Sequence, residues 1–364
     1  MSMKSREWFR TNWLSWSTLV VLVSFSKLAN AQSSVTLYGV IDTGILYTSR
    51  SVDSTGHPQG HKFAMSDGGI GGSRFGFQGK EDLGGGWKAI FRLESGISPS
   101  TGGFANSNRN FFGRWAYVGL DGPYGTVKAG LQYSPFAIAC IVTDPRGANY
   151  FGSGAVVYVG NVFVTGLFNS NAVSYVSPII GGFQGSAMVA LGGQAGNFRS
   201  GSQYSARLNY TQGPVKIDVA WYDGQPSTGA PVSPTPSTVE FEGRIVGVSY
   251  TWEKVTLKAN VTNLKVANSF NTYEYEFGGN YSIRPDLYFD AGVWIVRDGN
   301  NSENHSVLTA AGLQYLLSAR TSLYTSVAYV NNHGKMNTGV ATNGALFGAP
   351  GSTTGVILGM THAF

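Results

Sequence analysis

The chain has 364 residues, of which only 12% are charged and 13% are aromatic, and it contains 50 glycines and a formal net charge of +5. The charged fraction is about half that of an ordinary globular domain, and a nucleic-acid-binding protein would be expected to carry a clustered basic face. Both classes are therefore disfavoured. Because the mean hydropathy is close to zero, at −0.04, the composition suits a membrane barrel that is apolar outside and polar within.

Residues 1–31 have the pattern of a secretory signal peptide. A basic start precedes a short apolar stretch over 13–25 and an A-x-A cleavage motif at 29–31. A retained anchor would need about 20 apolar residues, which is more than this stretch offers. We therefore expect cleavage before Gln32 and a single mature barrel domain over 32–364. The loss of four basic residues and one acidic residue lowers the formal charge from +5 to +2.

The mature chain consists of short periodic segments separated by turn residues, which is typical of β-strands. Sixteen strands are predicted, and an even number is typical of single-chain bacterial barrels. The predicted fold is all-β, a 16-stranded antiparallel transmembrane β-barrel. The predicted strands are 35–47, 71–81, 86–97, 109–120, 125–134, 171–178, 184–193, 202–212, 214–223, 241–252, 255–265, 271–282, 286–297, 305–316, 321–332 and 353–364.

Alternation along the strands predicts which face each side chain occupies. Val215, Ile217 and Val219 point one way, whereas Lys216 and Asp218 point the other. Likewise, Glu274 and Glu276 lie on the inward face, opposite Tyr275 and Phe277. A soluble β-sandwich alternates as well, but its apolar face would be the inner one. Tyrosines and tryptophans near strand ends favour the barrel, because aromatic girdles mark the membrane interfaces. The girdle candidates are Trp87, Trp221, Tyr250 and Trp252.

The connections fall into two length classes, and in a barrel the short turns are periplasmic while the long loops are extracellular. The long connections are 48–70, 98–108, 135–170, 224–240 and 333–352. The third of them, 135–170, contains many apolar residues that require burial, Phe136, Phe151 and Val156 among them. We expect this loop to fold into the barrel and to narrow the lumen that sixteen strands would otherwise leave open.

Charged side chains on the inward face near this loop are candidates for ion selection, because a low-dielectric rim concentrates the field of a few charges. Alternation also places Trp115, which follows one of these arginines, on the lipid side. The loop itself adds one acid and one base, so a transverse field could result. The alternative is that each charge only solvates the lumen or pairs locally. The candidates are Arg74, Arg92, Arg114 and Lys128 with Asp42 and Glu94 on the wall, and Asp144 and Arg146 on the loop.

The residues that could carry chemistry do not form a catalytic or metal motif. An enzyme barrel would need a nucleophile with a nearby base, but His305 beside Ser306 lacks a recognisable triad spacing. His57 and His61 are four residues apart, yet the proline and glycine between them discourage the helix that would align both on a metal. Cys140, the one cysteine, excludes an intramolecular disulfide. No enzymatic activity, cofactor or metal is predicted.

Several segments together make the chain resemble the Gram-negative general porins of the beta-proteobacterial type. The resemblance covers essentially the whole mature chain and is densest in its first hundred residues. The segments are SVTLYGVID at 34–42, GSRFGFQGKEDLG at 72–84, FGRWAYVGL at 112–120, NAVSYVSP at 171–178, LSARTSLY at 317–324 and HAF at 362–364.

The resemblance implies a homotrimer in the outer membrane, in contact with its lipid and lipopolysaccharide. In the family the third long loop folds inward, the second contacts a neighbouring copy, and the terminal aromatic, here Phe364, is read by the barrel assembly machinery. Arg74 and Arg114 match the family's wall arginines at the narrowest point. No nucleic-acid partner is implied.

The chain also departs from the family pattern. Ser174 and Val176 lie where relatives often carry charge, and Leu131 replaces a frequent arginine. Fewer charges at the constriction imply either a weaker ion preference or a preference for less polar solutes.

Three functional hypotheses follow. The first is a water-filled pore for passive diffusion of small hydrophilic solutes and ions, with a weak preference for anions. The second is a substrate-specific channel for sugars or organic acids, which would use inward-facing aromatic residues. The third is a closed barrel that serves as an adhesin, receptor or enzyme. The inward aromatic candidates are Tyr38, Tyr222, Tyr288, Trp294 and Tyr324.

Overall fold

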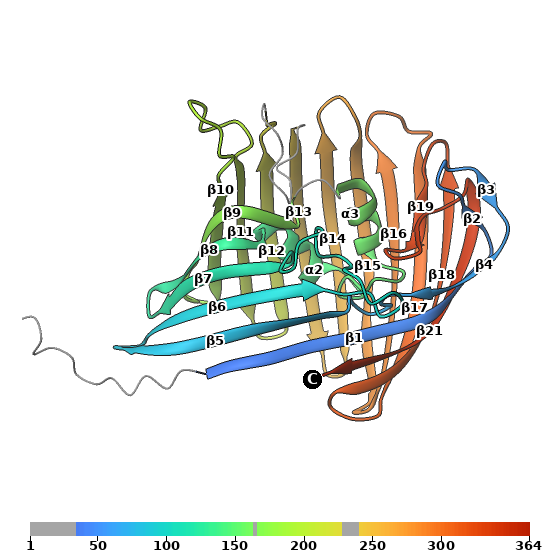
Figure 1. Ribbon diagram of the computed structural model, residues 1–364. Coiled ribbons are helices and arrows are strands. Elements are labelled where there is room, and N and C mark those ends of the chain that lie inside the picture. Colours follow the sequence, from blue (N-terminus) through green and yellow to red (C-terminus); the bar gives the residue numbers. More distant parts are fainter. Residues whose placement is uncertain (1–33, 163–165, 228–239) are drawn as a thin grey trace, which may run out of the picture.

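The computed structural model describes residues 34–162, 166–227 and 240–364. The predicted signal peptide and most of the predicted loop 224–240 lie outside these residues. Sixteen long antiparallel strands close into a barrel (Figure 1), which confirms the predicted fold class. The barrel strands are β1 (Ser34–Thr48), β5 (Arg74–Gly84), β6 (Trp87–Gly96), β7 (Trp115–Gly122), β8 (Gly125–Tyr133), β9 (Phe168–Val176), β10 (Phe183–Ala190), β11 (Gln203–Gln212), β12 (Val215–Gly224), β13 (Phe241–Trp252), β14 (Val255–Val266), β15 (Asn271–Arg284), β16 (Leu287–Asp298), β17 (His305–Leu316), β18 (Thr321–His333) and β21 (Gly351–Ala363).

Short helices and strands lie in the long connections between the barrel strands. No helix among the described residues is long and apolar enough to cross a membrane. The described residues contain two helices, α2 (Pro135–Thr143) and α3 (Gly154–Val162), and the short strands β2 (Ser51–Val52), β3 (Pro58–Gln59), β4 (Lys62–Ser66), β19 (Thr338–Ala341) and β20 (Ala345–Phe347).

One predicted strand boundary is wrong: the strand expected from residue 109 begins at Trp115. The preceding segment forms a loop in which Asn106, Asn108 and Arg109 have positive φ angles of 53°, 51° and 61°. Three left-handed residues within four positions interrupt the extended conformation of a strand. Alternation of side chains therefore starts later than the sequence suggested.

The barrel closes where β1 pairs with β21, from Val40 opposite Ala363 to Thr48 opposite Gly355. On its other side β1 pairs with β5 along its first half and with β4 along its second half. The segment between β4 and β5 leaves the wall and turns into the lumen. The neighbour of β1 therefore changes from β5 to β4 near the midpoint of β1. At this point the segment between β4 and β5 enters the candidate site.

Side-chain alternation follows the prediction, with apolar groups outside and polar groups inside. On β12, Val219 is 45% exposed on the lipid-facing surface, whereas Asp218 and Tyr222 on the inward face are buried. On β15, Tyr275 and Phe277 are exposed while Glu276 is buried. The predicted inward assignment of the β12 and β15 charges is confirmed.

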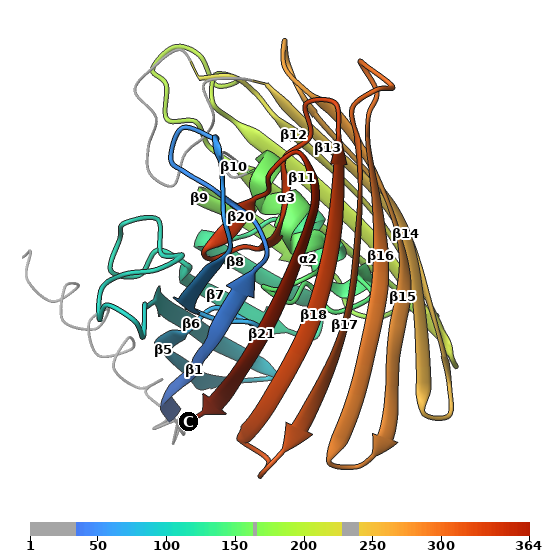
Figure 2. The ribbon, with the colours of Figure 1, turned by 90° about the vertical axis from the view of Figure 1, so that its right-hand side faces the viewer.

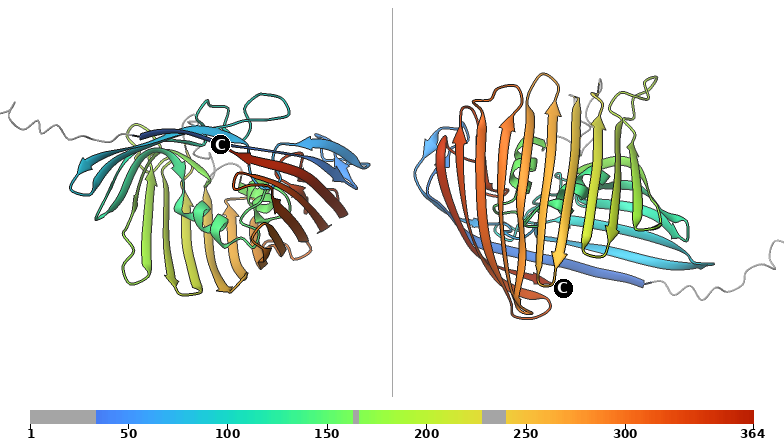
Figure 3. Two further views of the ribbon diagram at one scale, coloured as in Figure 1. Left: turned by 90° about the horizontal axis from the view of Figure 1, so that it is seen from below. Right: turned by 180° about the vertical axis from the view of Figure 1, so that it is seen from behind.

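The segment that carries α2 and α3 lies inside the barrel, as predicted. The left view of Figure 3, which looks along the barrel from the end with short turns, shows both green helices within the ring of strands, and Figure 2 shows them from the side. Ser134 caps α2 by accepting a hydrogen bond from the Ala137 amide at 3.0 Å, and its hydroxyl donates to the Gly166 carbonyl. The cap fixes the point at which the chain turns from β8 into the lumen.

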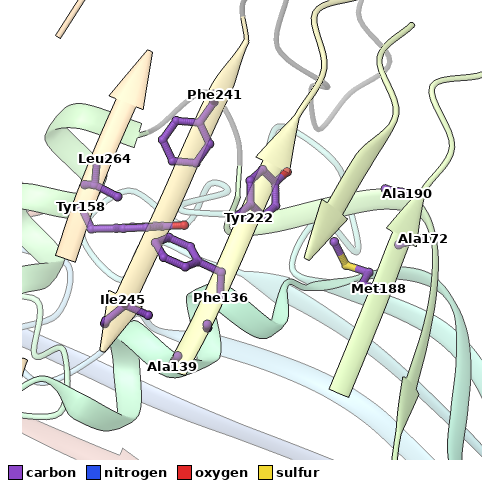
Figure 4. Close-up of a cluster of buried hydrophobic side chains, with 11 residues drawn as sticks. Phe136, Ala139, Tyr158, Ala172, Met188, Ala190, Tyr222, Phe241, Ile245 and Leu264 are labelled. Carbon is purple, nitrogen blue, oxygen red and sulfur yellow. The ribbon is translucent and has the colours of Figure 1, made fainter. Parts of the chain in front are cut away.

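Helix α2 packs on the inner surface of β10–β14. Phe136 is fully buried against Tyr222 and Phe241 (Figure 4). Gly243 makes this contact possible, because a Cβ atom there would lie 2.6 Å from the Phe136 ring. A second buried cluster around Phe151 and Trp294 holds the other end of the loop. The loop is thus fastened at both ends by apolar contacts.

Candidate functional site

A cavity of about 390 Å³ lies between the inner wall of the barrel and the inward-folded loop. The sequence predicted the loop as the constriction, and its two helices do line this cavity. The cavity is lined by segments that lie far apart in the sequence. The wall contributes Arg74, Arg92, Glu94, Arg114 and Tyr133, and the loop contributes Ala137, Cys140, Asp144, Tyr150 and Tyr158.

Glu94 is the centre of the charged wall and is only 1% exposed. Arg114 Nε donates to Glu94 Oε1 at 2.8 Å, and the Arg92 guanidinium donates to Oε2 at 2.5 Å. Arg74 Nε lies 3.9 Å from the same Oε2, and the Tyr38 hydroxyl donates to it at 2.8 Å. One carboxylate is thus shared by three guanidinium groups, so positive charge exceeds negative charge at this wall.

The strand register brings these groups together. Glu94 on β6 stands opposite Gly76 on β5 and opposite Trp115 on β7. A Cβ atom at Gly76 would lie 2.8 Å from the Tyr38 hydroxyl. The glycine therefore leaves space for Tyr38 to reach Glu94, and the wall is assembled from four neighbouring strands.

Two cations of the wall, Arg92 and Lys128, lie close to aromatic rings. The Arg92 guanidinium lies 5.0 Å from the Trp115 ring centroid and 5.1 Å from that of Tyr38. Lys128 Nζ lies 5.3 Å from the Tyr117 ring centroid and 5.9 Å from that of Trp115. The predicted lipid-side position of Trp115 is wrong. Because Arg114 precedes β7, it is not part of the alternation of that strand, and Arg114 and Trp115 both face the lumen.

Asp42 points inward as predicted, but it is fully buried and does not line the cavity. Its carboxylate accepts hydrogen bonds from the amides of Gly69, Ile70 and Gly71 at 2.9–3.1 Å, and from the Tyr324 hydroxyl at 2.6 Å. It therefore holds the segment between β4 and β5 in the lumen, next to the wall arginines. Asp42 is therefore engaged in local contacts, which is the alternative to ion selection that the sequence left open.

Asp144 is also held by local contacts. Its carboxylate accepts from the amides of Arg146, Ala148 and Gly154 at 2.7–2.9 Å and from Trp294 Nε1 at 3.1 Å. It is 1% exposed but borders the cavity. The carboxylate organises the turn between the two helices.

Arg146 fastens the same turn to the opposite wall. Its Nε donates to Asp290 at 2.5 Å, and its terminal nitrogens donate to the Phe151 and Gly152 carbonyls at 2.8 Å and to Ser326 Oγ at 2.9 Å. With all of these donors engaged, Arg146 is buried and does not line the cavity. The sequence predicted that the loop would present one acid and one base to the wall. Only the acid, Asp144, borders the cavity.

Comparison with known proteins agrees with this geometry. Residues 18–335 match the family described as Gram-negative porin. The chain belongs to this family. Outer membrane porin protein 32 of Delftia acidovorans is 27% identical over 95% of this chain and 98% of its own. Major outer membrane protein P.IB of Neisseria gonorrhoeae is 28% identical over 86% of this chain and 93% of its own.

Among solved structures, the anion-selective porin from Comamonas acidovorans superimposes with a TM-score of 0.78 and 25% identity, over 92% of this chain and all of that one. OmpT of Vibrio cholerae, at 15% identity and a TM-score of 0.64, shares the fold. The chain is thus an outer-membrane porin, and the predicted outer-membrane localisation and channel function are confirmed.

The sequence did not single out two acidic residues that border the same cavity. Glu274 and Glu276 lie on the inward face of β15 and are buried beside the turn that holds Asp144. Glu276 accepts a hydrogen bond from Asn260 at 2.7 Å. Alternation had placed both glutamates inward, but only the fold of the loop shows that they reach the constriction.

Most of the predicted inward aromatic residues are engaged in structural contacts. Tyr222, Trp294 and Tyr324 are buried, and each has a polar partner that fixes it: Asn169, Asp144 and Asp42, respectively. They support the loop and do not form an exposed track along the porin lumen.

Cys140 is partly buried in the wall of the cavity. Burial raises the pKa of its thiol well above the ordinary value, and the nearby Glu276, Glu274 and Asp144 act in the same direction. Among the described residues, no group of three or more His, Cys, Asp or Glu side chains is placed to hold a metal ion.

Proposed function

We propose that this porin allows passive diffusion of small hydrophilic solutes and ions with a weak preference for anions. The observation that carries the proposal is the wall on which Arg74, Arg92 and Arg114 share the single carboxylate of Glu94. Lys128 adds a fourth cation beside the aromatic rings. Such an excess of positive charge at a narrow, low-dielectric rim attracts anions and repels cations. The solved relative from Comamonas acidovorans is itself described as anion-selective.

Two features support a weak preference. The inward positions Ser174 and Val176 on β9 carry no charge, and Leu131 on the neighbouring strand β8 adds none. Glu94 itself offsets part of the charge of the three arginines that surround it. The net field is therefore smaller than the number of arginines suggests.

The structure offers little support for the alternative of a substrate-specific channel. A specific sugar or organic-acid path would need exposed aromatic or charged groups in succession, but Tyr222, Trp294 and Tyr324 are buried beneath the loop. The relatives described above are porins, and we propose no catalytic step.

Swelling of proteoliposomes that contain the porin distinguishes these functions. Uncharged sugars of increasing size should enter at rates that fall steadily with size and rise linearly with concentration. Saturation of the rate by one class of sugar would instead favour a specific binding site. No entry of any solute through a folded barrel would contradict the diffusion pore.

We infer that the porin acts as a homotrimer that contacts its neighbours through residues 97–114. This loop exposes Phe104 by 52% and Phe111 by 58%. The two rings pack edge to face at 6.0 Å, and Phe111 also packs on Phe75 at 6.3 Å. Exposed aromatic clusters of this kind are typical of protein interfaces. A structure of Vibrio cholerae OmpT is described as a trimer form.

Replacing Phe111 with serine should lower the fraction of trimers on unheated gels and in mass photometry. Phe198→Ser is the matched control, because Phe198 is 69% exposed in a different loop. An unchanged trimer fraction for Phe111→Ser would contradict this interface.

The C-terminal residue is proposed as the assembly signal. The Phe364 amide and carbonyl both pair with Gly39 at 3.1 Å, so the residue lies at the seam where the barrel closes. A Cβ atom at Gly39 would overlap the Phe364 ring. Recognition by the assembly machinery would have to precede this closure.

A further inference from the structure

A row of basic side chains crosses β16, β17 and β18 near the end of the barrel that carries the long loops. Arg297 stands opposite His305, and His305 stands opposite His333. Directly opposed residues on antiparallel strands have Cβ atoms about 4.5–5.5 Å apart. The two imidazole rings stack with their centroids 4.4 Å apart and their planes within 14°. These three residues form one continuous basic row.

The basic row faces away from the lumen. Its chain neighbours Val296, Ser306 and Asn332 are buried on the inner side, and alternation puts the row on the outer side. Arg297 and His333 are exposed, and His305 is partly exposed.

The position along the barrel is set by the neighbouring apolar and aromatic residues on the same face. Val327 and Leu313 lie farther toward the short-turn end and are 48% and 42% exposed. Tyr329 is the next residue after Val327 on the same face of β18, and Tyr273 stands directly opposite Arg297. Tyrosines of this kind mark the membrane interface. The row therefore lies at the upper edge of the apolar band, at the depth of the outer-leaflet headgroups.

Arg297 differs from other outward-facing arginines at strand ends in its lack of an acidic partner. Arg244 is paired with Glu242, and Arg284 with Asp286, each at 2.8 Å. In the described part of the chain, no carboxylate oxygen lies within 4.0 Å of the Arg297 guanidinium. An unpaired guanidinium beside two imidazoles is available to an external anion.

The loops that flank the basic row do not change its net charge. Glu303 and Lys335 are both exposed, one before β17 and one after β18, so they contribute opposite charges. Asn331 Nδ2 lies 3.1 Å from His333 Nε2 and helps to orient that ring.

We propose that the row of Arg297, His305 and His333 binds a phosphate group on the headgroup of an outer-leaflet glycolipid. A guanidinium offers paired N–H donors that match phosphate oxygens, and each imidazole adds an N–H donor. The site lies on the lipid-facing surface and is independent of the pore. It would fix an annular lipid at one side of the barrel.

Binding of diphosphoryl lipid A to the full-length mature porin in detergent, measured by native mass spectrometry, tests the site. The same lipid without its phosphates is the first control. Arg297→Gln should weaken binding about fivefold, the effect of one basic residue near an anionic surface. A His305→Gln/His333→Gln variant should weaken it further. Arg284→Gln is the matched control, because Arg284 is an outward arginine at the opposite end, and it should bind like wild type.

Equal binding of the dephosphorylated lipid would overturn the proposal, as would unchanged binding by Arg297→Gln. If millimolar inorganic phosphate displaces the lipid completely, the row is a general anion site and the lipid assignment is wrong. Conductance and heat-modified gel mobility confirm that each variant is a folded pore.

Discussion

Arg114 donates a hydrogen bond to Glu94 at 2.8 Å, and both side chains are almost completely buried although they border the lumen. The same carboxylate accepts from Arg92 and lies near Arg74. Glu94 therefore has two consequences: it holds the arginines in place, and it lowers the positive charge that a passing ion meets. The two effects can be separated by mutation.

Glu94→Gln should raise the preference for anions and reduce stability. Glutamine has nearly the same shape but cannot neutralise the guanidinium groups, and loss of one partner of a buried ion pair costs about 3–5 kcal/mol. The ratio of chloride to potassium current and the thermal unfolding temperature are the measurements. Asp218→Asn is the control, because it breaks the Arg207–Asp218 pair, which is not among the residues that border the cavity. Equal selectivity of Glu94→Gln and wild type would contradict the role of Glu94.

Arg146→Gln should loosen the constriction loop. The substitution removes the donors to Asp290 and to the Phe151 and Gly152 carbonyls, and buried acceptors without partners cost about 1–3 kcal/mol each. Single-channel currents should become noisier and larger on average. Arg207→Gln removes a wall ion pair of similar length and should leave the noise unchanged. Quiet, wild-type currents from Arg146→Gln would show that this anchor is dispensable.

Gly243→Val should displace helix α2. The added Cβ would lie 2.6 Å from the Phe136 ring, whereas a Cβ at Gly185 would come no closer than 3.9 Å to another side chain. Overpacking of a fitted core costs about 1–3 kcal/mol. Gly243→Val is therefore expected to unfold at lower temperature and to conduct differently, while Gly185→Ala should match wild type. Identical conductance of the two variants would argue against close packing of α2 on β13.

Cys140 should react slowly with a methanethiosulfonate reagent at neutral pH, and each modification should reduce conductance. Burial, and then Glu276, raises the pKa of the thiol, and the thiolate is the reactive form. Because a raised pKa shifts ionisation upward, the rate should keep increasing at pH values where an ordinary cysteine is already fully ionised. Cys140→Ser should be inert. A rate that levels off at the pH of a free thiol would contradict the buried environment.

Much of the fold could be predicted from the sequence because alternation is a local property. The opposite faces of Asp218 and Val219 required only a period of two. The start of β7 was misplaced because the positive φ angles at Asn108 and Arg109 leave no mark in a periodic pattern. The error also put Trp115 on the wrong side of the wall.

The site was less predictable because inward position and access to the lumen are different properties. Asp42 points inward, but amides from the segment between β4 and β5 enclose it. Arg146 lies on the loop, but its side chain is engaged by Asp290 and Ser326 of the distant wall. Glu274 was known to face inward, yet its place at the constriction depends on where the loop folds. Tertiary contacts of this kind cannot be derived from residue spacing.

The reversal potential of single porin channels across a potassium chloride gradient tests the central claim most directly. Wild type should give the sign of chloride preference, with a modest magnitude. Arg74→Gln, Arg92→Gln and Arg114→Gln, combined with Glu94→Gln to avoid an unpaired buried carboxylate, should move the potential toward zero. A cation-preferring wild type, or a quadruple variant with the wild-type potential, would contradict the proposal that the arginines around Glu94 select the ions.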